Sequence, residues 1–201
     1  MRIAMIVPAL LIAASASAQD FSYRYIEASG SERKDNESDI TLDTANVAVS
    51  LQSRAGALLQ ISLGAGEAED IAVAAGGPDG DVRSAEIFIG GARQLTDSTS
   101  AWTGIGAGRT RIEPDRGSDV DINTARFSLG LRHWLLSRVE VHGSTSIVYF
   151  DNDNLADEET DAELRLGLRV YPLRNVSLNV EGAYQFDERV EIVSASLRYD
   201  F

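Results

Sequence analysis

The chain has 201 residues, a formal net charge of −13 and no cysteine. This length suits a single domain. The negative charge argues against nucleic acid as a partner, and the lack of cysteine excludes disulfides and thiolate metal sites. No stretch after the N-terminal segment is apolar enough for a transmembrane helix, which argues against a helical inner-membrane protein.

The first 18 residues predict a cleaved signal peptide. Arg2 supplies a positive start, and residues 3–12 form an apolar run that is too short to span a bilayer. Ala16-Ser17-Ala18 has the small-x-small pattern of a cleavage site. We expect cleavage after Ala18 and one domain over residues 19–201; the alternative is a short N-terminal anchor.

From residue 21 onward the sequence alternates between apolar and polar residues in segments of about ten residues. This period of two is typical of strands with one apolar and one polar face. In the fifth segment the phase is unclear, because Ile105 shares a face with Arg109 and Arg111. The pattern predicts ten strands, at residues 21–29, 40–52, 57–66, 84–93, 101–112, 121–132, 138–150, 162–171, 176–186 and 190–201. Ile40 and Leu42 are out of phase with the rest of their strand, which predicts a bulge there or an extension beyond a bilayer.

The connections between these strands differ in charge. Residues 30–39, 67–83, 113–121, 151–161 and 187–189 carry net charges of −2, −4, −3, −6 and −1, a total of −16 against −13 for the whole chain. The connections after the second, fourth, sixth and eighth strands are short or weakly charged. In an antiparallel barrel these two sets lie at opposite ends, so the sequence predicts one acidic end facing a different compartment from the other.

Two short motifs carry a family resemblance. The chain opens with Ser22-Tyr23-Arg24-Tyr25-Ile26-Glu27 and closes on a strand whose one face holds Leu197, Tyr199 and Phe201. In these features it resembles the small outer-membrane β-barrel proteins of Gram-negative bacteria, and among them the ten-strand members. The resemblance implies an all-β fold, a ten-stranded antiparallel up-and-down transmembrane β-barrel in the outer membrane. It also implies that barrel assembly machinery reads Leu197, Tyr199 and Phe201 as an insertion signal.

The polar faces indicate which side of the sheet is inside. A soluble lipocalin-like barrel would show the same alternation with its apolar face inward. Here arginines and carboxylates share the polar faces, and an arginine in contact with lipid near the bilayer midplane costs about 2–4 kcal/mol. We therefore predict an ion-pair network that largely plugs the lumen, with glycines leaving room for the arginines. Its expected members are Arg24, Glu86, Arg126, Arg132, Glu140, Glu163, Arg165, Arg169, Glu181, Arg198 and Asp200.

Catalytic and metal-binding chemistry finds weak support. His142 and Ser144, with Glu140 as the orienting acid, could deacylate lipid A, but a His-x-Ser spacing is common by chance. Asp151, Asp153 and Asp157 could bind Ca²⁺ through oxygen, although they lack the glycine and register of a calcium loop. A solvated acidic loop is the simpler interpretation. Such loops could still bind lipopolysaccharide through divalent cations.

The tyrosines and tryptophans suggest a position at the membrane–water interface. They are Tyr23, Tyr25, Trp102, Trp134, Tyr149, Tyr171, Tyr184 and Tyr199. Taken together, the sequence predicts a non-enzymatic outer-membrane barrel without a cofactor, in a structural or surface-interaction role. The alternatives are a narrow channel for small solutes and a lipid-A-modifying enzyme.

Overall fold

The computed structural model describes residues 21–36, 41–69, 79–115, 118–152, 159–187 and 189–201. The proposed signal peptide lies outside these ranges. Within them, no helix has the length and apolarity needed to cross a membrane. The ten strands are β1 Tyr25–Asp35, β2 Thr41–Gln52, β3 Ala57–Glu69, β4 Asp79–Thr96, β5 Thr99–Pro114, β6 Val120–Leu136, β7 Val139–Asn152, β8 Glu159–Leu173, β9 Val176–Gln185 and β10 Val190–Asp200.

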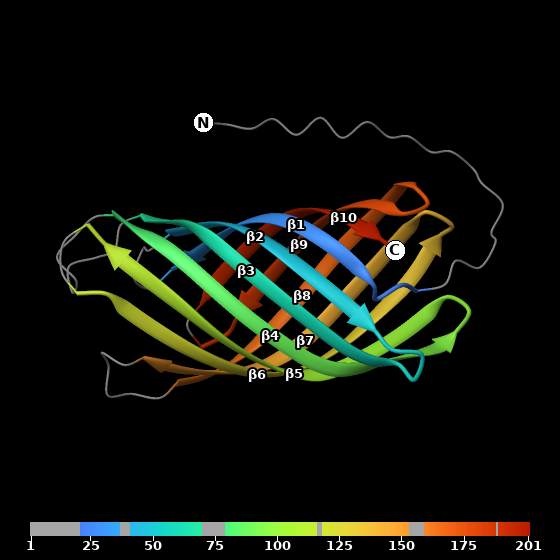
Figure 1. The fold of residues 1–201 in the computed structure, drawn as a ribbon, viewed down its shortest axis with the longest axis horizontal. Helices are drawn as coiled ribbons and strands as arrows, with labels where there is room; N and C mark the ends of the chain where they lie inside the picture. The colour runs from blue at the N-terminus through green and yellow to red at the C-terminus, as the bar shows by residue number, and fades with distance from the viewer. Residues whose placement is uncertain (1–20, 37–40, 70–78, 116–117, 153–158, 188) are drawn as a thin grey trace.

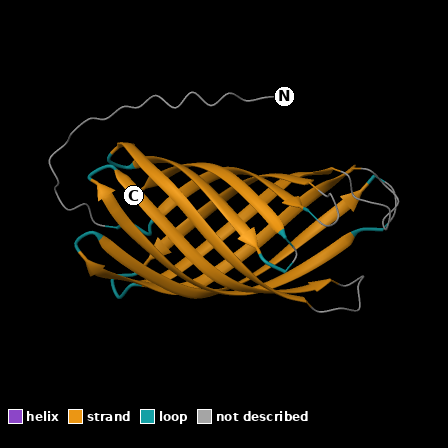
Figure 2. Cartoon of the chain, turned by 180° about the vertical axis from the view of Figure 1, so that it is seen from behind, coloured by secondary structure: helices purple, strands orange, loops and turns teal. Residues whose placement is uncertain are grey.

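The ten strands close into one antiparallel barrel (Figures 1 and 2), which confirms the predicted fold class. Each strand pairs with its neighbours in sequence, and β1 pairs with β10 from Tyr25 opposite Asp200 to Asp35 opposite Val190. Closure leaves no strand with an unpaired edge. This matters in a bilayer, because hydrocarbon offers no hydrogen bonds to exposed backbone groups.

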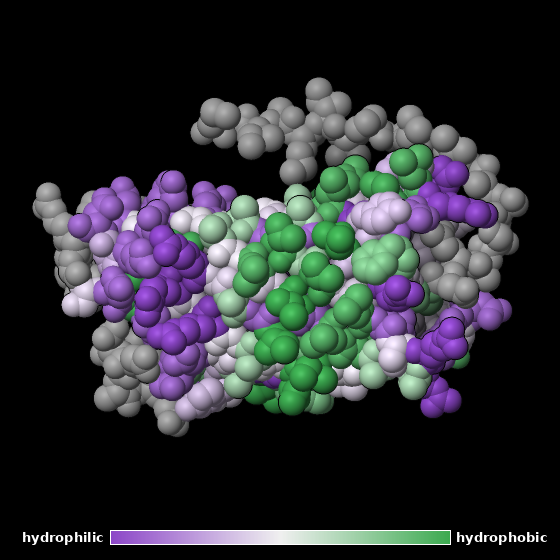
Figure 3. All heavy atoms as spheres, viewed as in Figure 1, coloured by the Kyte–Doolittle hydropathy of each residue, from purple (hydrophilic) through white to green (hydrophobic). Residues whose placement is uncertain are grey.

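The apolar faces of the strands point outward. On β8, Leu164, Leu166 and Leu168 are exposed, whereas Arg165 and Arg169 between them point into the lumen. Figure 3 shows hydrophobic side chains gathered over the middle of the barrel, with hydrophilic residues towards both ends. A soluble barrel would bury these leucines, so the outward belt is the surface that a membrane-spanning barrel needs.

In the fifth strand, the face that holds Ile105 points outward and the face that holds the glycines points inward. The Ile105 side chain is 63% exposed on the outer surface, and Gly106 beside it is buried. Arg109 and Arg111, which share the face of Ile105, are consequently exposed as well. They lie at the far end of β5, where their guanidinium groups contact the carboxylate of Asp121 on β6.

Several strands are longer than predicted. β4 has 18 residues and β6 has 17, and residues 30–35, which were expected to form a loop, belong to β1. His133 and Trp134, which the sequence pattern leaves between the sixth and seventh strands, lie in β6 beside a register shift before Leu136. Outside the hydrocarbon, backbone pairing continues without apolar side chains, so the alternation that marks a lipid-facing strand is lost before the strand ends.

No bulge marks the start of β2. Its pairing with β1 and β3 runs without a register shift from Thr41 onward. Leu42 points inward with Thr44 and packs against a small buried cluster of Ala68 and Val82. The phase change in the sequence therefore reflects an apolar residue inside the barrel. Ile40 lies outside the described residues.

The two ends of the barrel differ in their connections. Short turns join β2 to β3, β4 to β5, β6 to β7 and β8 to β9, and the acidic connections lie at the other end. We call these the short-turn end and the long-loop end. Gly56 makes the first turn possible: its φ of 86° is unfavourable for other residues, and an added Cβ would lie 2.6 Å from the carbonyl oxygen of Ala92.

The outward belt predicts a depth-dependent cost for charge. Leu166 and Leu173 on β8 are 63% and 64% exposed, but Leu166 lies at mid-strand and Leu173 at the short-turn end. We expect Leu166→Arg to lower the free energy of unfolding in lipid vesicles by about 2–4 kcal/mol and Leu173→Arg by about 0–1 kcal/mol. Denaturant titration of both variants measures this. Equal costs would contradict a bilayer around the middle of the barrel.

Candidate functional site in the barrel lumen

The chain before β1 turns into the lumen at the short-turn end. Phe21 and Tyr23 are buried, although neither belongs to a strand. The Tyr23 hydroxyl lies 3.0 Å from Ser100 Oγ on β5, and Ser50 Oγ on β2 donates a hydrogen bond of 2.9 Å to the Tyr23 carbonyl. Residues 21–24, which we call the closing segment, thereby contact strands on different sides of the barrel.

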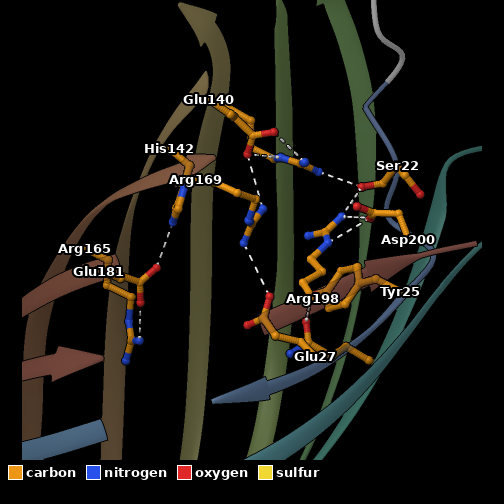
Figure 4. A network of polar contacts seen from close by, with 12 residues as sticks. Ser22, Tyr25, Glu27, Glu140, His142, Arg165, Arg169, Glu181, Arg198 and Asp200 are labelled. Atoms are coloured by element: carbon orange, nitrogen blue, oxygen red, sulfur yellow. Dashed lines mark hydrogen bonds and ion pairs between the residues drawn. The ribbon is translucent and has the colours of Figure 1, made fainter. Parts of the chain in front are cut away.

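Two arginines hold the closing segment through its backbone. Arg132 Nη1 on β6 and Arg198 Nη2 on β10 donate to the carbonyl oxygen of Ser22 at 2.8 and 2.7 Å. Figure 4 shows Ser22 beside Arg198 and Asp200. β6 is five places from β1 in the ten-strand ring and so lies on the opposite wall. The contact from Arg132 therefore reaches across the lumen.

Aromatic side chains fill the space around the closing segment. The Phe21 and Trp134 rings are 5.6 Å apart, and Trp134 lies 5.1 Å from Tyr171. The Arg132 guanidinium lies over the Tyr23 ring at 4.7 Å, a favourable cation–π arrangement. This end of the lumen is thus occupied by packed side chains.

The predicted interfacial position is wrong for most of the aromatic residues. Tyr23, Tyr25, Trp102, Trp134 and Tyr171 face the interior. Their sequence phase matches lumen-facing residues such as Glu27 and Arg169, and at the edge of the apolar belt an aromatic residue packs equally well inward. Tyr199 is exposed on the outer surface, as predicted.

Buried ion pairs lie directly beside the closing segment. Glu140 on β7 is fully buried and accepts two hydrogen bonds from Arg132, at 2.8 and 2.7 Å. Arg169 on β8 adds a contact to the same carboxylate at 3.3 Å and reaches Glu27 on β1 at 3.5 Å. Arg198 Nε donates to Asp200 at 2.9 Å. Because each guanidinium has a carboxylate partner, the cost of removing these charges from water is offset.

A second group of ion pairs lies in the lumen further from the short-turn end. Arg165 on β8 pairs with Glu163 on the same strand and with Glu181 on β9, the latter at 3.1 Å. The other Glu181 oxygen lies 3.0 Å from His142 Nε2. Gln185 donates to Glu163 at 3.1 Å. Arg126 on β6 forms an ion pair with Glu86 on β4, and both side chains are partly exposed.

Arg24 is the predicted network member that the structure places elsewhere. Its side chain is exposed on the outer surface, with the guanidinium 5.4 Å from the Phe201 ring. Tyr23 and Tyr25 on either side point inward. Where the chain leaves the apolar belt, aromatic side chains therefore face the lumen and the charged side chain faces outward. The other ten predicted members, from Glu86 to Asp200, lie in the ion pairs described above.

The sequence missed three contributors to the network. Glu27 follows the tyrosines in phase and could have been found from the alternation once these were placed inside. The Tyr25 ring lies 3.7 Å from the Arg198 guanidinium carbon, and His142 contacts Glu181. These two contacts join strands that are distant in sequence, so no local pattern predicts them.

Glycines make room for aromatic rings as well as for arginines. An added Cβ at Gly130 would collide with the Trp102 ring, and one at Gly167 would collide with the His142 ring. Gly106 faces the Arg126 side chain, as expected for a glycine that accommodates an arginine. The open face beside each glycine therefore explains how large side chains fit inside a ten-stranded barrel.

The catalytic candidates do not form a triad. Glu140 is engaged by Arg132 and Arg169, so it does not orient His142. His142 Nε2 contacts Glu181, and its Nδ1 is buried with no hydrogen-bond partner in the described part of the chain. No hydrogen bond therefore joins His142 to Ser144. In this arrangement the histidine does not activate the Ser144 hydroxyl.

The candidate metal ligands lie at the long-loop end. Asp151 is exposed near the end of β7, whereas Asp153 and Asp157 fall outside the described residues. Across the described ranges, no group of three or more histidine, aspartate or glutamate side chains is arranged to hold a metal ion.

Above the closing segment the lumen contains a cavity of about 700 Å³. It extends from Tyr23 and Arg132 at its base to Arg33, Asp35 and Glu159 at the long-loop ends of their strands. Phe21, Trp134 and Tyr171 lie below its base and do not line it. Serine and threonine hydroxyls and the ion pairs share its wall with apolar side chains such as Phe88 and Trp102, so the wall is mixed and carries charges of both signs.

Comparisons with known proteins show a similarity of fold and none of sequence family. No known sequence family and no curated protein matches this chain. Among solved structures it is similar to the NanC porin, with 12% identity and a TM-score of 0.52, over 88% of this chain and 100% of that one. It is also similar to the β domain of the Bordetella autotransporter BrkA, with 11% identity and a TM-score of 0.60, over 88% and 98% of the two chains. The chain thus has the fold of outer-membrane β-barrels.

The buried position of Glu140 predicts that its charge stabilises the barrel. Glu140→Gln leaves Arg132 and Arg169 without a full counter-charge, and removing one partner of a buried pair costs about 3–5 kcal/mol. Glu86→Gln is the matched control, because the Glu86 and Arg126 side chains are 24% and 27% exposed; we expect a smaller loss there, since water screens a partly exposed pair. Denaturant unfolding in micelles measures both. Equal losses would show that the buried network has no special importance.

Proposed function

We propose that this protein is a non-enzymatic integral barrel of the Gram-negative outer membrane, closed at its short-turn end. The observation that supports this most directly is the closing segment, whose Ser22 carbonyl is held by arginines from two strands. Phe21 and Trp134 pack beside it. A pathway for solutes would have to pass through these contacts. The outward apolar belt and the fold of the solved structures above support the membrane location.

The long-loop end supports a structural or surface-interaction role. The connections at this end carry the net charge of −16, and we propose that they face the cell exterior. Divalent cations would then link these loops to anionic lipopolysaccharide; equal thermal stability in lipopolysaccharide micelles with and without Mg²⁺ would contradict this.

Leu197, Tyr199 and Phe201 are exposed on the outer face of the barrel, where assembly machinery could read them.

The absence of a triad around His142 supports a non-enzymatic role. His142 and Ser144 both face the lumen cavity, away from the lipid acyl chains that a deacylase would attack. Deacylation of lipid A by the purified protein, abolished in Ser144→Ala, would overturn this part of the proposal.

The cavity favours one alternative, a narrow channel for small solutes. A volume of about 700 Å³ is within the range of ligand-binding pockets, and it reaches the long-loop end. Displacement of the closing segment would connect this cavity with the opposite side. Planar-bilayer recording distinguishes the alternative from a permanently closed barrel.

We expect no steady current from the wild-type protein in a planar bilayer. Phe21→Ala combined with Tyr23→Ala removes the two buried rings of the closing segment and should produce a measurable steady conductance. Phe88→Ala is the matched control, because this buried ring packs against Trp102 above the base of the cavity. It should stay closed. Steady current from the wild type would overturn the closed lumen and favour the channel.

A further inference from the structure

An arginine ring surrounds the short-turn end. Arg24 precedes β1, Arg54 lies between β2 and β3, Arg93 lies on the outward face of β4 near its end, Arg138 lies between β6 and β7, and Arg174 lies between β8 and β9. Three of the four short turns, the last residues of β4 before the remaining turn, and the chain before β1 thus carry one arginine each. Since the barrel is closed, these positions recur at every second strand around its circumference. All five side chains are exposed.

Four of these arginines differ from the others in the barrel in their partners. The lumen arginines pair with carboxylates, and at the long-loop end Arg83 contacts Glu113 while Arg109 and Arg111 contact Asp121. By contrast, no carboxylate in the described chain forms an ion pair with Arg24, Arg54, Arg93 or Arg138. Arg138 donates to the Pro172 carbonyl at 3.3 Å, and Arg24 lies over the Phe201 ring.

The charge balance at this end is positive. Against the five arginines, the part of this end that the structure describes presents one exposed side-chain carboxylate, that of Asp97. Glu140 and Asp200 are also near this end, but they are buried and already paired with Arg132 and Arg198. The arginine ring is therefore a surface of net positive charge.

Exposed apolar side chains lie beside the arginines. Leu95 follows Arg93, Leu136 precedes Arg138 by two residues, and Leu173 precedes Arg174. All three leucines are more than half exposed. The ring consequently lies at the edge of the apolar belt, at the depth where a bilayer changes from acyl chains to headgroups. Arginine is suited to this depth, because its stem packs on apolar surface and its planar guanidinium matches a phosphate.

We propose that the arginine ring binds the phosphates of anionic phospholipids in the leaflet that faces the short turns. A soluble anionic polymer would match the charge, but it would leave the leucines beside the arginines exposed to water. A lipid headgroup satisfies both groups at once. The inference rests on the proposed membrane location and is independent of whether the lumen is closed.

Spin-labelled lipids in zwitterionic bilayers test this binding with the full-length protein. At low salt we expect the lipid shell of the wild type to prefer labelled phosphatidylglycerol over labelled phosphatidylcholine, by about fivefold for each arginine–headgroup contact. The triple variant Arg54→Gln, Arg93→Gln and Arg138→Gln should lose most of this preference. High salt should weaken the wild-type preference, because exposed charge interactions are screened.

A control with the same change in net charge separates the ring from a general electrostatic effect. Arg83→Gln, Arg109→Gln and Arg111→Gln remove three exposed arginines from the long-loop end and should leave the preference almost intact. A wild type without preference, a ring variant that retains it, or a control that loses it equally would each overturn the proposal. Heat-modifiability on gels shows that both variants are folded, and a conducting wild type would refute the closed lumen without affecting this result.

Discussion

The contact between Arg132 and Glu140 organises the interior of the barrel. Glu140 is fully buried, and its carboxylate receives a two-pronged contact from Arg132 and a third from Arg169. Arg132 in turn holds the Ser22 carbonyl, and Arg169 reaches Glu27. Strands β1, β6, β7 and β8 are therefore joined through one carboxylate, in a medium where an uncompensated charge is expensive. Through Arg132, this contact is one of those that position the closing segment.

The barrel separates charge in two directions. Across the wall, apolar side chains face outward and ion pairs line the lumen. Along the axis, acidic connections occupy one end and exposed arginines the other. The first separation is required of any polypeptide that spans a bilayer as strands. The second is not, so it gives information about what each end contacts, and it underlies both the proposed exterior position of the acidic loops and the proposed phospholipid contact of the arginine ring.

The strand pattern was predictable because lipid imposes a strict rule. Leu164, Leu166 and Leu168 alternate with Glu163, Arg165 and Gly167, and both the strand and its inner face follow from this alternation. Outside the lipid the rule is absent. The extension of β1 beyond Gly30 and the inward position of Tyr23 were missed for this reason. Contacts made by the backbone, such as those at the Ser22 carbonyl, leave no trace in a pattern of side chains.

Which lumen residues contact each other could not be predicted from the sequence, for another reason. The polar faces identify His142, Arg165 and Glu181 as residents of the lumen, but their contacts depend on the stagger of β7, β8 and β9 around the ring. In the same way, Arg24 and Arg126 look alike in sequence, and their height relative to the apolar belt decides that one lies outside and the other inside.

The pairing of β1 with β10 also has a consequence for biogenesis. The backbone N–H and C=O groups along one edge of β1 have no partner until β10, the last strand, has been synthesised. A nascent chain that emerges from the ribosome therefore carries an open edge for the whole of its translation, and an edge of that kind readily joins other chains. The protein is therefore exposed to association with other chains until β10 pairs with β1 and the ring is sealed.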